Sequence, residues 1–465
     1  MAHLRLTFKH RTFALSLAAL CVTGALTAVA TSAYAAPGAA QPAATAVKIT
    51  VSKTGSGTIG NGFAGFSYEK DRIGAGVFNA TDTNLVNLFK LLGPNVIRIG
   101  GNLNDIVKWN PNGAGGSASE VAPPDVTKLA GFLQATGWKV IYGINLKINT
   151  AANAASEAQF AAHALGSSLI AFEIGNEPNF YTTESAYESS YNSYLKAIKA
   201  VVPNAVFDGP GCGDTTAWVS AFGSHEKNNS LQILSTHLYI GSNTSGTISG
   251  MLASTASGRL PSTWATMQST QKADGISQWR MTETNSYYHG GTAGVSDVEA
   301  ASLWSLNYMD GVAAHGGAGV NFHGGSSSQF PLNYTPITYS GITPTGVQGV
   351  YYGELLWVMA GTGAFHTATV SGGKGVTAWG IGDNVLVDNI GSSAVSATIT
   401  LSASATGAGE YVLTAPSLSS HAVTIGGSAV GVSGSFTPNP TSVSVSGTTT
   451  TVTIPADSAA LVQTH

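Results

Sequence analysis

Short apolar runs alternate with helical patterns through most of this chain, and that alternation constrains the fold more than any other feature. Eight such runs occur between residues 63 and 322. They are Phe63–Ser67, Asn95–Ile99, Lys139–Ile144, Leu169–Ile174, Ala205–Phe207, Gln232–Ser235, Gln278–Met281 and Gly319–Phe322. Continuous apolar strands that alternate with helices are typical of parallel βα units covered on both faces. Eight units predict a (β/α)8 TIM barrel over residues 61–360, with its chemistry at the C-terminal ends of the strands.

The stretches between these runs have the amphipathic spacing of helices. The clearest are Thr83–Leu92, Val126–Thr136, Glu157–Leu165, Ser185–Val201, Pro261–Lys272 and Asp297–His315. An open, doubly wound sheet is the alternative arrangement of such units. It is usually accompanied by a glycine-rich turn after its first strand, and this chain lacks one.

Beyond Thr362 the pattern changes to short alternating strands separated by Gly, Ser and Asn turns. Seven strands are expected, at Thr367–Val370, Val376–Gly380, Asn384–Asp388, Ser396–Leu401, Gly409–Leu413, His421–Ile425 and Thr450–Ile454. This pattern predicts a C-terminal antiparallel β-sandwich over residues 361–465. The alternating strand Val47–Lys53 has no helix after it, so we expect it to join this sheet.

The N-terminus has the order of a secretory signal peptide. Basic residues come first, an apolar run from Phe13 to about Ala30 follows, and the small-residue pattern Ala33-Tyr34-Ala35 ends it. We therefore expect residues 1–35 to be removed and the protein to be secreted or periplasmic, with no membrane partner. Residues 36–60 would form a leader and the N-terminal strand.

Charge excludes several classes of partner. Charged residues make up 9% of the chain, the net charge is −4, and no Lys or Arg follows Lys374. Nucleic acids and highly sulfated polymers need clustered basic side chains, so neither is expected as a partner. His237, His289 and His323 lack metal-ligand spacing, and no phosphate-binding loop occurs, so we expect neither a metal nor a cofactor.

Two glutamates mark the expected active site. Glu177 follows the fourth apolar run in the segment Ile174-Gly175-Asn176-Glu177-Pro178, and Glu283 follows the seventh. Strands four and seven face each other across a barrel mouth. Paired carboxylates in that position suit glycoside hydrolysis, with retention of configuration at about 5–5.5 Å separation and inversion at wider separation.

Other polar residues follow the remaining strands in the same way. Those after strands one and two are Glu69, Arg98, Asn102 and Asp105, and those after strands six and eight are His237, Tyr239 and His323. Arg98 is expected to be a buried cation that lowers the pKa of a carboxylate. Lys70, Arg72 and Lys147 are interpreted as solvated loop charges.

Several of these segments together resemble glycoside hydrolase family 79, the β-glucuronidases and heparanases. The resemblance spans the barrel and the trailing β-sandwich. It is carried by Ile97–Gly101, Tyr142–Asn145, Phe172–Asn179, Thr236–Tyr239, Glu283–Gly290 and Asn321–His323.

This resemblance implies Glu177 as acid/base and Glu283 as nucleophile. Asn176 would then bond the sugar 2-hydroxyl, and Tyr239 would hold the nucleophile. The remaining substrate-binding residues are expected to be Tyr288, Gly290, Tyr334, Glu69, Asn102, Asp105 and His323. Tyr334, with backbone N–H groups of the Ser326–Thr338 loop, would contact the glucuronate carboxylate.

The chain departs from heparanases because it lacks their basic clusters and an excisable linker. Heparan sulfate cleavage is therefore not expected. An exo-acting, monomeric β-glucuronidase fits better, one that releases glucuronate or its 4-O-methyl ether from oligo- or polysaccharides. Two alternatives remain open: another retaining enzyme, such as an arabinofuranosidase or xylanase, and a non-catalytic carbohydrate-binding protein of the cell surface.

Overall fold

The computed structural model describes residues 44–326 and 331–465. The predicted signal peptide and the first part of the leader lie outside these residues. No helix in the described ranges is long and apolar enough to cross a membrane.

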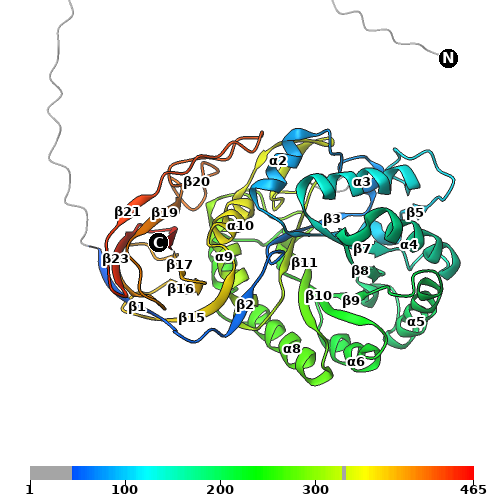
Figure 1. Cartoon of the computed structure of the whole chain (residues 1–465), viewed down its shortest axis with the longest axis horizontal. Coiled ribbons are helices and arrows are strands. Elements are labelled where there is room, and N and C mark those ends of the chain that lie inside the picture. The colour runs from blue at the N-terminus through cyan, green and yellow to red at the C-terminus, as the bar shows by residue number, and fades with distance from the viewer. Residues whose placement is uncertain (1–43, 327–330) are drawn as a thin grey trace, which may run out of the picture. The chain divides into compact units, whose positions relative to one another are not determined.

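Eight parallel strands close into a barrel in the order β10-β11-β12-β3-β4-β7-β8-β9, shown in Figure 1. The predicted TIM barrel is thus confirmed and the open sheet is excluded. The strands are β3 (Gly65–Glu69), β4 (Val96–Gly100), β7 (Lys139–Ile144), β8 (Leu169–Ile174), β9 (Phe207–Gly213), β10 (Leu231–Ser242), β11 (Gln278–Tyr288) and β12 (Val320–Gly324).

Strands β10 and β11 extend well beyond the apolar runs that predicted them. They stay paired as far as Ser242 and Tyr288, so Glu283 lies within β11 instead of directly after it. Backbone pairing does not require apolar side chains, and the apolar pattern ends where polar residues of the barrel mouth begin.

Helices cover the barrel, and all six predicted helices are present. They are α2 (Thr83–Leu91), α3 (Pro123–Thr136), α4 (Ala151–Leu165), α5 (Glu184–Val201), α8 (Arg259–Asp274) and α9 (Glu299–Ala314). Several begin at a hydroxyl cap: the Thr183 side chain, for example, accepts a hydrogen bond from the N–H of Ala186, as N-cap residues do. The chain also forms α1 (Asp71–Gly74), α6 (Ala217–Glu226), α7 (Ile248–Ala253), α10 (Gly349–Met359), and the short 3-10 helices η1 (Asn102–Asp105), η2 (Gly166–Ser168) and η3 (Pro178–Phe180).

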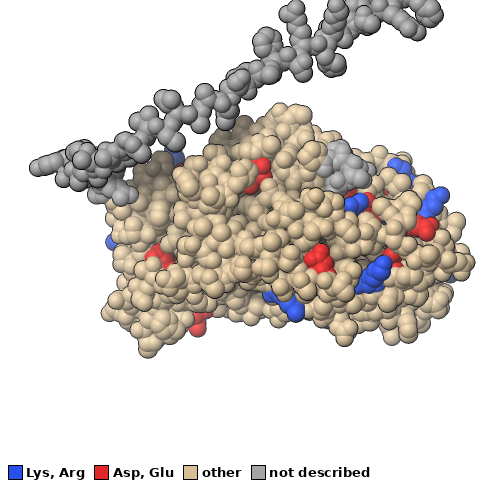
Figure 2. Space-filling model, turned by 90° about the horizontal axis from the view of Figure 1, so that it is seen from above, with Lys and Arg blue, Asp and Glu red and all other residues tan. Residues whose placement is uncertain are grey.

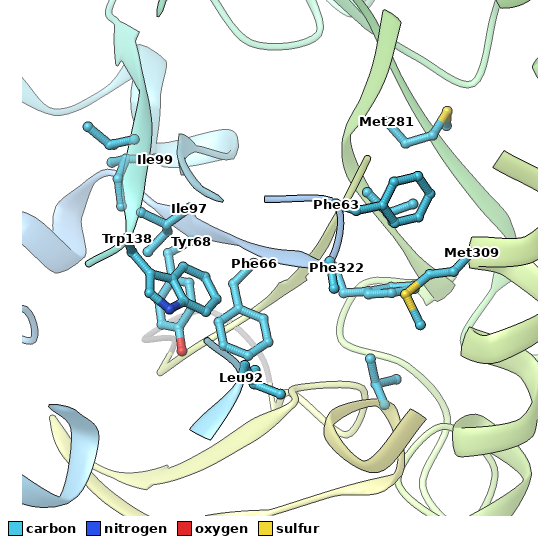
Figure 3. Packing of buried hydrophobic residues seen from close by; sticks show 14 of the residues in the cluster. Phe63, Phe66, Tyr68, Leu92, Ile97, Ile99, Trp138, Met281, Met309 and Phe322 are labelled. Atoms are coloured by element: carbon cyan, nitrogen blue, oxygen red, sulfur yellow. The ribbon is translucent and has the colours of Figure 1, made fainter. Parts of the chain in front are cut away.

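Aromatic and branched side chains fill the space between strands and helices (Figure 3). The ring of Phe66 on β3 stacks on Trp138 at 5.2 Å between centroids and meets the edge of Phe89 from α2 at 5.3 Å. Close packing of this kind fixes the strand ends on which the site is built.

The C-terminal residues form a β-domain whose strands share one continuous sheet path, β20-β19-β24-β17-β16-β15-β1-β18-β23-β22. Their bounds are β15 (Gly363–Ser371), β16 (Val376–Ile381), β17 (Asn384–Asn389), β18 (Val395–Thr400), β19 (Ala408–Thr414), β20 (Thr424–Ile425), β21 (Thr441–Val443), β22 (Val445–Ser446), β23 (Thr449–Ile454) and β24 (Ser458–Thr464). Strand β1 (Thr45–Val51) lies between β15 and β18, and β2 (Gly57–Ile59) pairs with β15. The pairing of β1 with β18 is parallel, whereas its pairing with β15 is antiparallel.

Strand β24 was not predicted, because its residues are buried on both faces and do not alternate. It lies in the half of the sheet that contacts the barrel. Along β17, Val385 and Val387 belong to the core of the β-domain, whereas Leu386 between them belongs to the barrel cluster. Successive strand residues point to opposite faces, so this half of the sheet is covered on both sides. Two small strand pairs complete the fold: β5 (Lys108–Trp109) with β6 (Glu120–Val121), which is parallel, and β13 (Ile337–Ser340) with β14 (Thr343–Val347), which is antiparallel.

Candidate active site

A cavity of about 370 Å³ opens at the C-terminal ends of the barrel strands. Its size falls within the range of small-molecule sites. The described residues that line it are Glu69, Asn102, Glu177, Phe180, Asp214, Tyr239, Glu283, Tyr288, His289, His323, Leu332 and Tyr334. Both predicted catalytic glutamates and six of the predicted substrate-binding residues are therefore brought together.

Glu177 stands on a strained turn directly after β8. Its φ of 47° is in the left-handed region, which is costly for a residue with a side chain and is most frequent at functional sites. The Glu177 N–H donates to the carbonyl of Gly211 at 3.0 Å, which fixes the turn against β9. A side chain at Gly213 would lie 2.6 Å from Oε1 of Glu177, so glycine there leaves room for the carboxyl.

Burial raises the pKa of Glu177, and His237 and Glu283 modify that rise in opposite directions. His237 Nδ1 lies 3.1 Å from Glu177 Oε1 and lowers the pKa, while the charge of Glu283 raises it. The net shift is upward, so the group keeps its proton to a higher pH than an ordinary glutamate does, as a general acid requires.

Glu283 is surrounded by groups that stabilise its ionised form. Arg98 Nη1 donates to Oε2 at 2.6 Å, and the hydroxyl of Tyr239 donates to Oε1 at 2.8 Å. Burial by itself raises the pKa of Glu283, but His323, His237, Arg98 and the Tyr239 hydrogen bond together lower it to about 2. This carboxylate is ionised throughout the physiological range.

The two carboxyl groups are close to each other. Carboxylate oxygens of Glu177 and Glu283 and a ring nitrogen of His237 all lie within 4.8 Å of one another. This is the one His/Cys/Asp/Glu group among the described residues that is compact enough to hold a metal ion. Within this group His237 contacts Glu177, and Glu283 accepts hydrogen bonds from Arg98 and Tyr239.

Sequence reasoning missed a buried acidic pair beneath the site. Glu173 on β8 accepts a hydrogen bond from Arg98 Nε at 2.8 Å. The carboxyl of Asp208 on β9 is also buried and interacts with that of Glu173. Burial raises the pKa of Glu173, but Arg98, His237 and the hydrogen bond with Asp208 together outweigh that and lower it, whereas burial and Glu173 raise the pKa of Asp208. Glu173 is therefore the ionised partner that fixes Arg98. The sequence did contain a signal for this pair, because Glu173 is a charged residue between Phe172 and Ile174 in an otherwise apolar strand.

Glu69 is a third carboxyl group in the cavity. It accepts backbone N–H groups of Asn102 at 3.2 Å and Leu103 at 2.7 Å, and a side chain at Gly101, whose φ is 71°, would lie 2.3 Å from it. Burial and the charge of Glu283 raise the pKa of Glu69 to about 8, so the group is uncharged in acidic and neutral solution. His323 Nε2 lies 3.7 Å away.

Three predicted substrate-binding residues are not in the cavity lining. Asp105 accepts the backbone N–H of Leu146 at 3.0 Å and of Asn176 at 3.1 Å, so it braces the loops after strands two, three and four. The Oδ1 of Asn176 accepts from Arg98 Nη2 at 2.8 Å. Gly290 contributes its carbonyl, which accepts the N–H of Tyr334 at 3.2 Å.

The tyrosines of the cavity wall are held by packing. Tyr334 stacks on Tyr239 at 6.1 Å between centroids, and Tyr288 meets His289 edge-on at 4.8 Å. Asn285 on β11 donates to the carbonyl of Tyr334 at 3.0 Å, which ties Tyr334 to the strand that carries Glu283.

The interpretation of Lys70 and Arg72 as solvated charges was wrong. Lys70 is buried and pairs with Glu157 at 2.7 Å, and Arg72 is buried against Asp71 and donates to Ser326 at 2.9 Å. Helix α1 turns inward directly after β3, so these cations stabilise the barrel rim. Lys147 is exposed as expected and lies over the ring of Tyr181.

No protein-family model and no curated protein matches the sequence, so the resemblance to family 79 stays a prediction. Solved structures match over nearly the whole chain. They are glycoside hydrolases with the same two-part architecture, a barrel followed by a β-domain, and this likeness establishes the fold.

Three of these solved structures show how similar they are to this chain in fold and in sequence. A 4-O-α-L-rhamnosyl-β-D-glucuronidase from Fusarium oxysporum 12S, in complex with Rha-GlcA, has a TM-score of 0.75 at 22% identity, over 89% of this chain and 100% of that chain. A family 51 α-L-arabinofuranosidase from Bifidobacterium longum has a TM-score of 0.66 at 15% identity, over 90% of this chain and 100% of that chain. A bifunctional glucanase-xylanase from a metagenome library has a TM-score of 0.61 at 14% identity, over 90% of this chain and 99% of that chain.

Proposed function

We propose that this protein is a retaining glycoside hydrolase. The observation that carries the proposal is the approach of Glu177 and Glu283, whose carboxylate oxygens come within 4.8 Å of each other. Retaining enzymes hold their two carboxyl groups about 5–5.5 Å apart, while inverting enzymes leave about 6.5–9.5 Å for a water molecule. The opposite pKa shifts of the two groups supply one acid and one ionised nucleophile.

The reaction then proceeds by double displacement. Glu283 attacks the anomeric carbon while Glu177 gives its proton to the departing glycosidic oxygen, so one C–O bond forms as the other breaks. Water, deprotonated by Glu177, next hydrolyses the glycosyl–Glu283 ester and restores both groups. Arg98 and Tyr239 hold the nucleophile in place before and after each step.

We further propose that the sugar is a β-linked glucuronate or its 4-O-methyl ether. Two features favour it: Tyr334 lies in the cavity wall, and Glu69 is uncharged below about pH 8 and so does not repel an anion. Neutral donors would hold the carboxylate, because no Lys or Arg is among the described lining residues. The first structure described above is a glucuronidase by its name.

A polymeric anion is a poor candidate for the substrate. Figure 2 shows few cations and anions on the visible face, several of them next to a group of opposite charge, and no extended basic patch there. Long-range attraction of a sulfated chain needs an extended basic field. We therefore propose a glycan with isolated glucuronate residues as the substrate, acted on outside the cell because of the predicted signal peptide.

An α-L-arabinofuranosidase is the second candidate. The absence of Lys and Arg from the described lining suits a neutral sugar at least as well as an anionic one. A non-catalytic carbohydrate-binding protein is disfavoured, because it would have no use for an ionised and a protonated carboxyl within 4.8 Å of each other.

A panel of 4-nitrophenyl glycosides separates these candidates. β-Glucuronide, β-xyloside, α-arabinofuranoside and β-galacturonide are compared by kcat/KM, and proton NMR identifies the anomer released first. We expect the β-glucuronide to be preferred and the β-anomer to form first. Release of the α-anomer from a β-glycoside would overturn the retaining mechanism, and preference for the arabinofuranoside would overturn the glucuronate assignment.

A further inference from the structure

An exposed aromatic ring stands beside the acid/base group. Six large hydrophobic side chains are exposed among the residues that the structure describes, and Phe180 is the most exposed of them, at 64%, and the one aromatic. Five of the six are isolated aliphatic groups, which are normal on a protein surface. Phe180 instead lines the cavity three residues after Glu177.

The turn that carries Phe180 is locked in place. Asn179 Nδ2 donates to the carbonyl of Gly213 at 2.8 Å, and the N–H of Gly213 donates to Asn179 Oδ1 at 2.9 Å. The N–H of Phe180 donates to the carbonyl of Glu177 at 3.0 Å. A side chain at Gly213 would lie 2.6 Å from Cε2 of the Phe180 ring. The backbone that carries the ring is therefore fixed, and a ligand that packs on the ring would need to order little of the main chain.

The position of Phe180 in the barrel assigns it to one side of the cavity. Phe180 and Asp214 follow β8 and β9, whereas Glu69 is on β3, which lies across the closed barrel from β9. Because Glu177 protonates the departing oxygen, the leaving group occupies the side of β8 and β9. The cleaved sugar occupies the side of Glu69 and His323, beside Glu283.

The rim next to Phe180 carries no unpaired charge among the described lining residues. The carboxylate of Asp214 is paired with Arg259 at 3.0 Å, and the Asp214 N–H donates to the carbonyl of His237 at 3.1 Å. The pair cancels in charge, so an anionic leaving group gains no net attraction there. The C–H face of a neutral sugar ring can pack on an aromatic ring such as that of Phe180. The hydroxyl groups around the sugar ring can form hydrogen bonds with polar groups beside it.

We infer that Phe180 and the Asp214–Arg259 pair form a leaving-group subsite that takes an uncharged pyranose ring. This inference rests on the proposed function, because it assigns the second subsite of the same reaction. It implies that the leaving group of the substrate is a neutral sugar, and that a simple alkyl leaving group fills only part of this subsite.

The test measures how the glycosyl-enzyme partitions between acceptors and water. The donor is 4-nitrophenyl β-glucuronide, or the best substrate of the panel, and the acceptors are xylose, galacturonate and methanol. Every donor with the same sugar gives the same intermediate, so the product ratio reports on the leaving-group subsite alone. We expect the wild type to transfer to xylose more readily than to galacturonate.

Replacing the ring should change that ratio. Phe180→Ala should lower transfer to xylose relative to water by about tenfold, equivalent to about 1.4 kcal/mol, and lower transfer to methanol much less. Phe180→Tyr should retain most of the transfer. Val432→Ala, at an exposed apolar residue of the β-domain, is the matched control, and melting curves show that each variant is folded.

The outcomes distinguish the two proposals. An unchanged xylose ratio in Phe180→Ala, or hydrolysis by the wild type without transfer to xylose, would overturn the subsite. Equal transfer to galacturonate would overturn its preference for an uncharged ring. Absence of hydrolysis on every glycoside would overturn the proposed function itself.

Discussion

His237 lies against Glu177, with Nδ1 3.1 Å from Oε1 and the imidazole fully buried. Burial and the charge of Glu283 raise the pKa of Glu177, and His237 offsets part of that rise. The pKa of Glu177 therefore depends in part on a side chain from β10, a different strand from the one that precedes Glu177.

His237→Ala should move the alkaline limb of the pH profile upward. Loss of the His237 contact removes a stabiliser of ionised Glu177, so the acid form persists to higher pH. The measurement is kcat/KM against pH, with His237→Gln as the control that retains a donor. An unmoved alkaline limb in both variants would show that His237 does not act on Glu177.

The roles of the two glutamates can be separated by their leaving-group dependence. Glu283→Ala should abolish turnover, and azide should rescue it with formation of an α-glycosyl azide. Glu177→Ala should spare 4-nitrophenyl substrates far more than substrates with poor leaving groups, because 4-nitrophenolate departs without a proton. Product NMR and a series of substituted phenyl glycosides provide the data. The same leaving-group dependence in both variants would contradict the assignment.

Tyr334→Phe tests whether its hydroxyl recognises the uronate. A neutral hydrogen bond contributes about 0.5–1.5 kcal/mol, so activity on the β-glucuronide should fall by about tenfold, while activity on the β-glucoside changes little. Tyr411→Phe in the β-domain is the control. Equal losses on both sugars would show that Tyr334 supports the site without recognising the carboxylate.

The acidic residues at the contact between the barrel and the β-domain should make stability depend on pH. Glu299 on α9 is buried, its N–H donates to the carbonyl of Ser420, and burial together with Asp457 raises its pKa to about 8. A group with a raised folded pKa contributes stability below its unfolded pKa, near 4.5 for Glu, and loses it as the pH rises through about 8.

The melting temperature should therefore fall by several degrees between pH 5 and pH 9. Glu299→Gln, which stays uncharged at every pH, should reduce that fall. Asp388→Asn provides a second variant, because burial and Glu299 raise the pKa of Asp388 as well. An identical pH slope in all three proteins would exclude this origin.

Removing residues 362–465 should give insoluble protein. Trp379, Leu386 and Leu461 of the β-domain pack into the same cluster as the barrel core, so their loss would expose apolar surface on α9 and α10. Solubility after expression and activity of a barrel ending near Gly361 are the measurements. A soluble, fully active barrel would show that the β-domain is dispensable.

Sequence patterns predicted the barrel because its strands contain or adjoin short apolar runs, and a run such as Val140–Ile144 is buried on both faces. They could not predict the inward turn of Lys70, because the partner that compensates its burial, Glu157, is on a helix two units away. The two glutamates of the cavity were identifiable from their place after the fourth and seventh apolar runs, although Glu283 lies within β11. Asp105 was assigned to the substrate for the same reason, although its oxygens are occupied by backbone N–H groups, which only the folded loops reveal.

The place of β1 between β15 and β18 has a consequence for how the chain is completed. The first strand of the described residues must wait for partners that are synthesised much later, with Lys48 opposite Ser371 on one side and Thr398 on the other. Until then both of its edges are open, and an open strand edge invites pairing with another chain. A chain that ends before β18 leaves one edge of β1 without its partner strand. Ribosomal stalling or proteolytic cleavage ahead of β18 would therefore yield a fragment prone to aggregation, whereas a chain that includes β18 can cover both edges of β1.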